Sequence, residues 1–439
     1  MADSESEVVR LLRDLLRFDT TNPPGNETPC AEFLHGMFRA EGFDSVVVES
    51  APGRGNVVAR LKGGSEPPLL LCAHLDVVPA SGKWTHPPFA AEVHDGYIWG
   101  RGAIDMKHMA AMCVVIMLEL KRRGVKLKRD VIFAGVADEE AGGAYGAGWL
   151  VDHRPELIRA EYCLCEVGGI ATPMGGKILV PVQTAQKGYV WFKLRARGQG
   201  GHGSRPGVAA DGSAVVALAK AVAKLSAKPL TYRLTATTRA FLDTVATLQT
   251  GAGKAAMAAL KNGQTAAFAL KLLPQERRKT FHAMLFDTVA VTGLVAGAKV
   301  NVIPPDAEAT VDGRFLPGGT KEQFVAQVQA LVGQDIEVDV FDSAPPLEID
   351  HRGPLWDSIV KVMTRELPGC TVAANMITGM TDAKDFDRLG IKTYGFSPVL
   401  LKEGEDFAEL YHAPDERVSI AGLEAGLTWL RGVVEDFCL

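Results

Sequence analysis

Apolar residues recur along the chain at two spacings, which predict alternating helices and strands. EVVRLLRDLLRF (7–18) and AEFLHGMFRAEGF (31–43) repeat apolar residues every three or four positions, as amphipathic helices do. NVVARL (56–61) and PLLLCAHLDVV (68–78) have the short, apolar pattern of buried strands. KHMAAMCVVIMLELKRRG (107–124) predicts a long buried helix that ends in basic residues and glycine. Such alternation is typical of α/β proteins.

The pattern changes after Lys187. Two further buried strands, VIFAGVAD (131–138) and AEYCLCEVG (160–168), come before it, whereas YVWFKLRARG (189–198) alternates apolar and polar residues like a strand with one exposed face. Together with the segments that follow, this strand predicts the order strand, helix, strand, strand, helix, strand of a split-βαβ sandwich. The later segments are DGSAVVALAKAVAKL (211–225), TVAVTGLVAG (288–297), DAEATVDGRF (306–315), KEQFVAQVQALVG (321–333) and IEVDVF (336–341).

The length of 439 residues exceeds the usual size of a single core, so two domains are expected. The helix GPLWDSIVKVMTREL and the strand KTYGFSP, near the carboxyl terminus, resume the pattern of the first half. We therefore expect a catalytic domain of residues 1–187 and 344–439, interrupted by a smaller α+β domain of residues 188–343. Within the smaller domain, residues 228–285 are rich in Ala, Leu and Lys and predict a helical insertion.

Composition narrows the class of protein. The net charge is −5 with no basic stripe, which argues against nucleic acid as a partner. The acidic amino terminus lacks the features of a signal peptide, and no apolar run reaches the roughly 18 residues of a membrane span, so we expect a cytoplasmic protein with no membrane partner. Seven scattered cysteines without a CxxC pair predict reduced, mostly buried thiols.

GQGGHG (198–203) matches the glycine pattern of dinucleotide-binding loops. No helix opens directly behind it, and the stretch about 20 residues further on has no acidic residue to bind a ribose. We therefore do not expect a dinucleotide cofactor.

Polar residues occur where several predicted strands or their loops should reach the carboxyl edge of a sheet. His74 and Asp76 are two residues apart, so on a strand they would point to the same side. This edge is where open α/β sheets bind ligands. Two histidines, three carboxylates and a spare glutamate together match the nitrogen and oxygen ligand set of a two-zinc hydrolase. The further residues are Asp105, Asp138, Glu139, Glu140, Glu166 and His412.

The chain resembles the M20 metallopeptidases, a family that includes aminoacylases, glutamate carboxypeptidases and desuccinylases. The likeness runs from about residue 7 to the end, and the insertion with KVNVIPP looks most like the carboxypeptidase S and N-acyl-amino-acid hydrolase branch. It implies an α/β, di-zinc aminopeptidase-like catalytic domain, with a mixed sheet between helices, interrupted by a ferredoxin-like lid and dimerisation domain. The matching motifs, in family order, are HLDVVP, GRGAIDMK, ADEEAGG, KG, GHGSRP, KVNVIPPDAEATVDGRF and YHAPDE.

The resemblance also implies roles at the metal site. His74 and Glu166 would bind two separate Zn²⁺ ions, which Co²⁺ or Mn²⁺ could replace, and Asp105 would bridge the ions and be followed by a cis peptide bond. A bridging carboxylate offsets the repulsion between ions about 3.5 Å apart, and such a pair converts a shared water to hydroxide near neutral pH. Glu140 and His412 would complete the ligand set, Glu139 would be the general base and acid, and Asp76 would hold the tautomer of His74.

Other implied site residues belong to the inserted domain or to a later loop. His202 would come from the other subunit of a homodimer and polarise the scissile carbonyl. Arg314 would bind a substrate carboxylate, with Asn301 as its partner. Thr381 and Asp382, in GMTDAKDF, match a family loop beside the substrate site.

These features predict a zinc-dependent hydrolase that cleaves the amide bond of an N-acyl amino acid or short peptide next to a free carboxylate, using a metal-bridging hydroxide. One alternative is a dipeptidase or aminopeptidase of the same family, which would need an acidic partner for a free amine, and Asp382 is the one clear candidate. A second alternative is a catalytically silent binding protein. Retention of Glu139 and of a complete ligand set argues against that second alternative.

Overall fold

The computed structural model describes residues 5–174, 176–208, 212–402, 404–405 and 409–439. They divide into two compact units. The first unit contains Met1–Thr184, Ile349–Asn375 and Thr381–Leu439, and the second contains Ala185–Glu348 and Met376–Met380.

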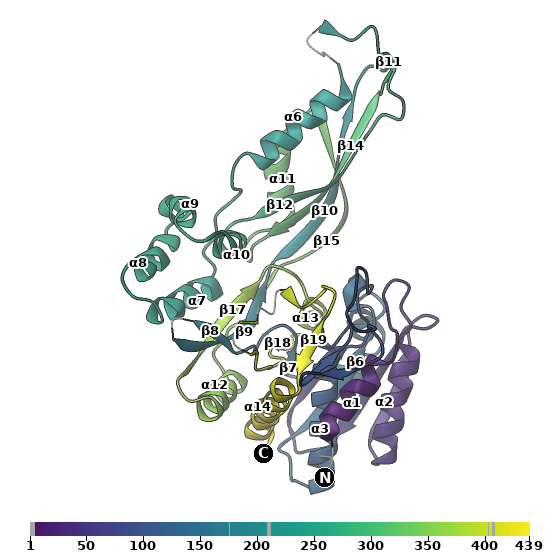
Figure 1. The fold of residues 1–439 in the computed structure, drawn as a ribbon, viewed down its shortest axis with the longest axis vertical. Helices are drawn as coiled ribbons and strands as arrows, with labels where there is room; N and C mark the ends of the chain where they lie inside the picture. Colours follow the sequence, from purple (N-terminus) through teal and green to yellow (C-terminus); the bar gives the residue numbers. More distant parts are fainter. Residues whose placement is uncertain (1–4, 175, 209–211, 403, 406–408) are drawn as a thin grey trace. The chain divides into compact units, whose positions relative to one another are not determined.

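A mixed β-sheet forms the centre of the first unit (Figure 1). Its strands are β1 (Asp44–Glu49), β2 (Gly55–Leu61), β3 (Glu66–His74), β6 (Arg129–Val136), β7 (Tyr162–Cys165), β8 (Thr172–Met174), β9 (Lys177–Gln186), β17 (Cys370–Ile377) and β18 (Lys392–Gly395). The main path runs β1-β2-β6-β3-β7-β18-β9, and β8 and β17 also pair with β9. Strands β6, β3, β7 and β18 are parallel, so their carboxyl ends meet at one edge.

Helices cover both faces of this sheet. Helices α4 (Ala147–His153), α5 (Pro155–Ile158) and α13 (Ala383–Asp387) pack into one apolar cluster with β2, β3, β6 and β7. The remaining helices of the unit are α1 (Glu7–Leu16), α2 (Thr28–Ala40), α3 (Lys107–Arg123), α12 (Pro354–Glu366) and α14 (Ile420–Cys438). Among the residues that the structure describes, no helix is both long and apolar enough to span a bilayer.

Strand β3 and helix α3 show why the sequence pattern folds in this way. Residues 69–73 of β3 are fully buried, as expected for a central strand that is covered on both faces. Helix α3 is also buried along almost its whole length, and it ends at Gly124, whose φ of 58° is in the left-handed region that favours glycine. The cysteines are free thiols, and all except Cys370 are buried, as the sequence predicts.

A small three-stranded sheet lies in the loops of the first unit. Its strands are β4 (Val93–His94), β5 (Tyr97–Trp99) and β19 (Arg417–Ser419), in the order β19-β5-β4. It therefore joins the residues just before the Asp105 loop to those just after His412.

The second unit is built on a four-stranded antiparallel sheet in the order β12-β14-β10-β15. Its chain order, with α6 after β10 and α11 after β14, is the predicted strand, helix, strand, strand, helix, strand arrangement of a ferredoxin-like fold. These elements are β10 (Gly188–Arg197), α6 (Ala214–Ser226), β12 (Thr288–Ala296), β14 (Asp306–Phe315), α11 (Lys321–Val332) and β15 (Ile336–Ala344). Shorter strands are β11 (Gly201–His202), β13 (Val302–Ile303) and β16 (Leu347–Glu348).

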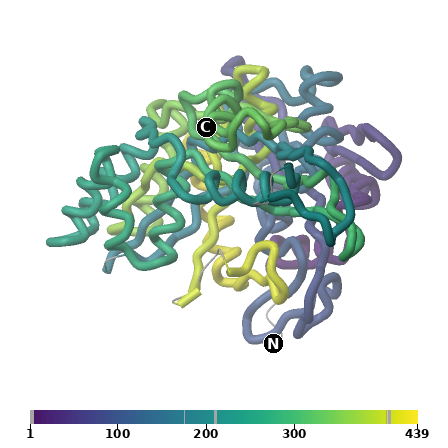
Figure 2. The backbone as a smooth tube through the Cα atoms, turned by 90° about the horizontal axis from the view of Figure 1, so that it is seen from above, coloured from purple at the N-terminus to yellow at the C-terminus, as the bar shows by residue number. Residues whose placement is uncertain are grey.

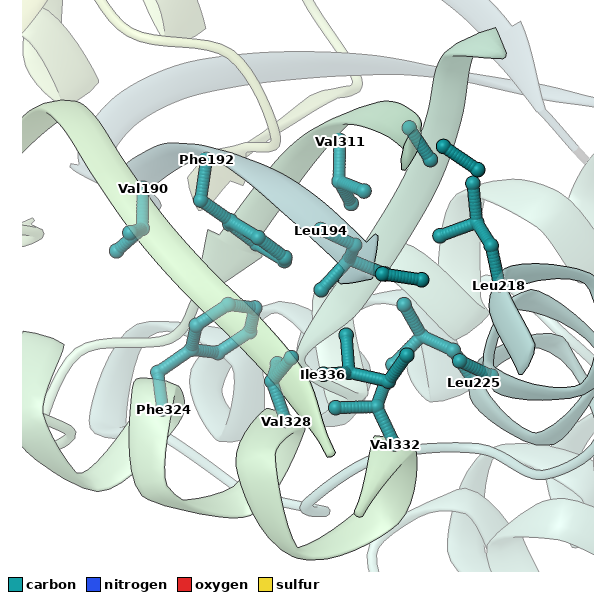
Figure 3. Close-up of a cluster of buried hydrophobic side chains, with 14 of the residues drawn as sticks. Val190, Phe192, Leu194, Leu218, Leu225, Val311, Phe324, Val328, Val332 and Ile336 are labelled. Atoms are coloured by element: carbon teal, nitrogen blue, oxygen red, sulfur yellow. The ribbon is translucent and has the colours of Figure 1, made fainter. Parts of the chain in front are cut away.

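Alternate residues of the sheet form the core of this unit (Figure 3). Val190, Phe192 and Leu194 of β10 point toward the two helices, which contribute Leu218 and Leu225 from α6 and Phe324, Val328 and Val332 from α11. The intervening residues of β10 are partly or fully exposed, which explains the alternating pattern after Lys187.

Four short helices lie between α6 and β12, where the sequence predicts a helical insertion. In Figure 2 they form the coiled teal group at the side of the view. They are α7 (Ala236–Thr247), α8 (Gly251–Leu260), α9 (Gly263–Lys271) and α10 (Gln275–Leu285). The buried Lys187 ammonium donates to the carbonyls of Ala283 and Phe286 and to the Thr288 hydroxyl at 2.8–3.1 Å, which ties the end of this group to the start of β12.

Candidate metal centre

The predicted ligands of the first unit come from the carboxyl ends of neighbouring parallel strands and from two loops. His74 is the last residue of β3, Glu166 follows β7, and Glu140 lies in a 3₁₀ turn (Glu139–Ala141) after β6. Asp105 lies two residues before the start of α3, and His412 lies in the loop before β19. The Asp105–Met106 peptide bond is cis, as the family resemblance implies, and so is Glu166–Val167.

Asp105 stands between two groups of ligand atoms. Its Oδ1 lies 3.2 Å from Nε2 of His74, and its Oδ2 lies 3.0 Å from Nε2 of His412. Glu166 Oε2 is 3.6 Å from the first imidazole nitrogen, and Glu140 Oε2 is 3.2 Å from the second. The two groups are therefore His74, Asp105 and Glu166, and Asp105, Glu140 and His412.

This grouping corrects one expectation from the sequence. We expected His74 and Glu166 to bind separate ions, but the structure places them together on one side of Asp105. The physical reason is the strand order, because β3 and β7 are direct neighbours and their carboxyl ends are adjacent. Glu140 follows β6 on the other side of β3 and lies with His412 instead.

The donor atoms and their electrostatics fit two cations. Oε1 of Glu140 is buried and has no hydrogen-bond partner among the residues that the structure describes. Burial, followed by the nearby carboxylates, raises the pKa of Glu140 and of Glu166, although hydrogen bonds from the histidines oppose this. Hydrogen bonds to Asp105 and Glu140 raise the pKa of His412 to about 10. Such crowding of anionic groups around imidazoles is relieved when divalent cations take the place of protons.

Asp76 orients both His74 and the turn that follows β6. Its backbone carbonyl lies 2.9 Å from Nδ1 of His74 and accepts the Nδ1 proton, so Nε2 is the nitrogen that faces Asp105 and Glu166 and that would be left to bind a metal ion. The Asp76 carboxylate, 3.5 Å from the same nitrogen, accepts hydrogen bonds from the backbone N–H groups of Glu139 and Glu140 at 3.1 Å. Asp76 lies just beyond the end of β3 and not on the strand as predicted, which allows it to reach both neighbours.

A buried polar network that the sequence did not indicate supports this turn. Asn22 donates to Asp76 at 2.8 Å and to Asp138 at 3.2 Å, and Arg54 donates to Asp138 at 2.5 Å. Asp138 adopts a left-handed conformation with φ of 70°, which is uncommon outside glycine. The network therefore holds the conformation of the turn that carries Glu139 and Glu140.

Glu416 supports the Asp105 loop in a similar way. Its Oε1 accepts hydrogen bonds from the backbone N–H groups of Ile104 at 2.8 Å and Asp105 at 3.0 Å, while Oε2 accepts from Arg101 at 2.6 Å. Both charged side chains are almost completely buried. Glu416 is the last residue of YHAPDE, one of the motifs shared with the family, so its position there could have marked it as a site residue. Its role was not predicted because its hydrogen-bond partners lie more than 300 positions away in the sequence.

Glu139 and Asp382 are acidic groups close to the ligands. Burial is the largest cause that raises the pKa of the Glu139 carboxyl well above its usual range, followed by the charge of Glu166. Burial also raises the pKa of Asp382 to about 7, although the Lys384 ammonium, 4.0 Å away, opposes this. Neither carboxylate oxygen of Asp382 has a hydrogen-bond partner among the described residues. The adjacent Thr381 is buried as well.

The three remaining predicted site residues belong to the second unit. His202 lies in β11 and its Nδ1 accepts from the Ser204 hydroxyl at 2.8 Å, and Asn301 is exposed in the loop before β13. Arg314, on β14, binds both carboxylate oxygens of Asp312, at 2.7 and 3.0 Å. Its guanidinium also lies 5.5 Å from the ring centre of Tyr189, directly across the strand pair.

Comparison with known proteins identifies relatives over nearly the whole chain. Residues 70–436 match peptidase family M20/M25/M40. A probable carboxypeptidase S-like protein 2 of Dictyostelium discoideum is 30% identical over 379 residues, covering 80% of this chain and 68% of that protein. The N-fatty-acyl-amino acid synthase/hydrolase PM20D1 of Xenopus tropicalis is 28% identical over 452 residues, covering 97% of this chain and 85% of its own.

A solved structure shares the fold. The M20 family metallo-carboxypeptidase Sso-CP2 of Sulfolobus solfataricus superposes with a TM-score of 0.73 at 16% identity, over 98% of this chain and 99% of that one. The predicted α/β fold with a separate small antiparallel sheet is thereby confirmed. The family match over most of the chain confirms the resemblance found in the sequence motifs. The chain therefore belongs to peptidase family M20/M25/M40 and is a metallohydrolase of that family.

Proposed function

We propose that this chain is a two-zinc amidohydrolase that cleaves an N-acyl or C-terminal peptide bond next to a free carboxylate. The observation that carries the proposal is Asp105, whose two oxygens face two separate ligand groups. One ion would be held by His74 and Glu166 and the other by Glu140 and His412, with Asp105 shared between them. Mixed imidazole and carboxylate donors suit zinc, and Co²⁺ or Mn²⁺ could substitute.

Bound zinc would supply Lewis acidity, which polarises the scissile carbonyl and acidifies water. Glu139 is next to a ligand in the chain without belonging to either ligand group, so it is free to take the proton from the attacking water. It would then donate that proton to the leaving nitrogen, because an unprotonated amide nitrogen is a poor leaving group. The raised pKa of Glu139 favours a group that can both accept and return a proton.

The substrate carboxylate is assigned to Arg314. Its Nε and Nη2 donate to the Asp312 carboxylate, which orients the guanidinium, so a substrate carboxylate would bind through the remaining Nη protons. Asn301 would assist this contact. The names of the curated relatives, a carboxypeptidase and an N-fatty-acyl-amino acid hydrolase, support substrates with a free carboxylate at one end. Small N-acyl amino acids or short peptides are therefore the proposed substrate class.

The second unit is proposed to act as a lid and to form a homodimer, with His202 reaching the partner's site as an oxyanion donor. Two features of this unit support a contact surface. Strand β12 is an edge strand of the four-stranded sheet, and edge strands offer unpaired backbone groups to a partner. Several large apolar side chains near β12 and β13 are also exposed, namely Leu294, Val295, Val300 and Val302. The cytoplasmic location remains a prediction.

A dipeptidase or aminopeptidase activity is the second candidate, and Asp382 is the observation that favours it. Its buried carboxylate has no hydrogen-bond partner for either oxygen among the described residues, so it could receive a substrate ammonium. Under this alternative, blocking the substrate's amino group should abolish cleavage. Under the leading proposal, N-blocked substrates should be cleaved.

The proposal is tested with a panel of N-acyl amino acids, their methyl esters and free dipeptides, incubated with zinc or with a chelator. We expect zinc-dependent release of free amino acids from the N-acyl substrates, measured by mass spectrometry. Release from dipeptides alone would favour the alternative, and no release with zinc bound would indicate a silent binding protein.

Three variants test the assigned residues. Glu139→Gln should lose nearly all turnover but retain both ions, and normal turnover would refute its role as the base. Arg314→Ala should raise KM for substrates with a free carboxylate and not for their methyl esters. An equal effect on both kinds of substrate would refute the assignment of Arg314 to the substrate carboxylate. Mixed dimers of Glu139→Ala and His202→Ala chains should regain activity if His202 acts across the dimer, and verified subunit exchange without recovery would refute that assignment.

A further inference from the structure

A third group of metal-ligating side chains lies in the first unit and shares no residue with the centre around Asp105. Oε2 of Glu92 is 3.2 Å from Nδ1 of His86 and 2.8 Å from Nε2 of His94. One ligand atom from each of the three residues lies within 4.8 Å of the other two. Two imidazoles and a carboxylate therefore converge on one point that the proposed hydrolysis does not use.

The small three-stranded sheet brings these side chains together. His94 lies on β4, Glu92 is two residues before it, and His86 belongs to the preceding loop. The ring of His86 stacks on that of His94 with ring centres 3.8 Å apart, and it also makes an edge-on contact with the Trp99 ring at 4.7 Å. This packing holds both imidazoles against the same carboxylate oxygen.

The donor set determines which ligand fits. Two nitrogens and one oxygen suit zinc and its neighbours in the first transition series, whereas Mg²⁺ and Ca²⁺ prefer oxygen ligands throughout. Hydrogen bonds from His94 and His86 lower the pKa of Glu92, which favours the ionised form of its carboxylate. The three side chains are between one fifth and two fifths exposed, so an ion can enter and water can fill the remaining coordination position. Because the rings are nearly parallel, one of them must turn to share an ion with the other.

We propose that His86, Glu92 and His94 form a binding site for a divalent transition-metal ion, separate from the Asp105 centre. Its place in the fold indicates what the ion would do. Thr85, next to His86, donates from its backbone N–H and its hydroxyl to the two oxygens of Asp415, each at 2.7 Å. Asp415 lies between His412 and Glu416 in the chain. An ion at this site would therefore stabilise the position of the loop that carries His412, a proposed ligand of the catalytic metal ions.

The test is a count of zinc ions bound to the full chain after equilibrium dialysis. The double variant His86→Asn, His94→Asn should bind one equivalent fewer than the unmodified chain. The matched control is His153→Asn, because His153 is an exposed histidine stacked on Trp149 and belongs to neither ligand group nor to this site. The control should bind as many equivalents as the unmodified chain. Equal counts in all three proteins would overturn the proposal.

A second pair of measurements separates this site from the proposed function. Glu92→Gln, which keeps the side-chain shape, should also lose one equivalent, and it serves if the double variant does not fold. Cobalt titration should show an absorbance band that disappears in Glu92→Gln and persists in Glu140→Gln. Because the result is a difference between variants, it holds whether the Asp105 centre binds two ions, one or none. A band unaffected by Glu92→Gln would refute the site.

Discussion

Glu416 provides a sharp test of how the Asp105 loop is held. Its carboxylate accepts three hydrogen bonds, from Arg101 and from the backbone N–H groups of Ile104 and Asp105, and it is fully buried. In Glu416→Gln the side-chain oxygen can still accept hydrogen bonds from the backbone N–H groups of Ile104 and Asp105. The new amide N–H₂ group then faces the Arg101 guanidinium, and two hydrogen-bond donors that face each other cannot pair. Removing one partner of a buried ion pair costs about 3–5 kcal/mol, since the remaining charge stays buried without compensation. We expect a loss of that size in the free energy of unfolding.

Urea unfolding, followed by circular dichroism, measures this loss, and zinc analysis shows whether the Asp105 loop still holds its ligand in place. Glu119→Gln is the matched control, because Glu119 pairs with Arg431 at 2.7 Å while both side chains are about 30% exposed. That change should cost about 1 kcal/mol or less. The double variant Arg101→Met, Glu416→Leu should lose less free energy of unfolding than the sum of the losses in Arg101→Met and in Glu416→Leu, because it leaves no unpaired buried charge. A Glu416→Gln protein with the stability and zinc content of the control would refute the reasoning.

Four further outcomes are expected. Burial lowers the pKa of His108 from 6.5 to about 4, so the folded chain binds fewer protons than the unfolded chain between these values. Stability should therefore fall by roughly 3 kcal/mol as the pH drops through this window, and urea titrations of His108→Gln should show a flatter dependence. Lys187→Met leaves three acceptors, one buried and two partly buried, without their donor and should reduce the free energy of unfolding by about 2–4 kcal/mol. Limited proteolysis should cleave residues 275–285 faster, and unchanged cleavage would contradict the anchoring role of Lys187. Asn22→Leu should lower zinc retention and turnover together, because Asp76 and Asp138 lose a shared donor, and dialysis followed by metal analysis decides this. Chelation should lower the melting temperature in calorimetry, since a ligand that binds the folded state stabilises it, and an unchanged melting temperature would argue against bound metal.

The spacing of apolar residues along the chain and the residue types of the strands were sufficient to predict much of the fold. The continuous apolar run of β3 and the alternation of β10 are local consequences of burial on two faces or on one, so they predicted a central strand and a half-exposed strand correctly. The positions of His74 and Glu166 at strand ends followed from the same reading, because parallel strands bring their carboxyl ends to one edge. Strands β9 and β17 and helix α14 were not predicted. For β17 the reason is visible, since its mixed, partly exposed residues have no clear period.

Tertiary structure alone decided how the site is assembled. Strand order placed His74 with Glu166 and left Glu140 to His412, which residue types could not reveal because all of these side chains are acceptable zinc ligands. The residues that hold the site in place, such as Glu416 and Asn22, could not be predicted from local sequence either. Glu416 reaches Asp105 across 311 positions, and Asn22 reaches Asp138 across 116. A hydrogen bond depends on distance and direction in space, whereas sequence patterns report burial and backbone conformation over a few neighbouring residues. The sequence by itself therefore determined which elements form and which chemical groups they carry, and only the folded chain determined which atoms meet.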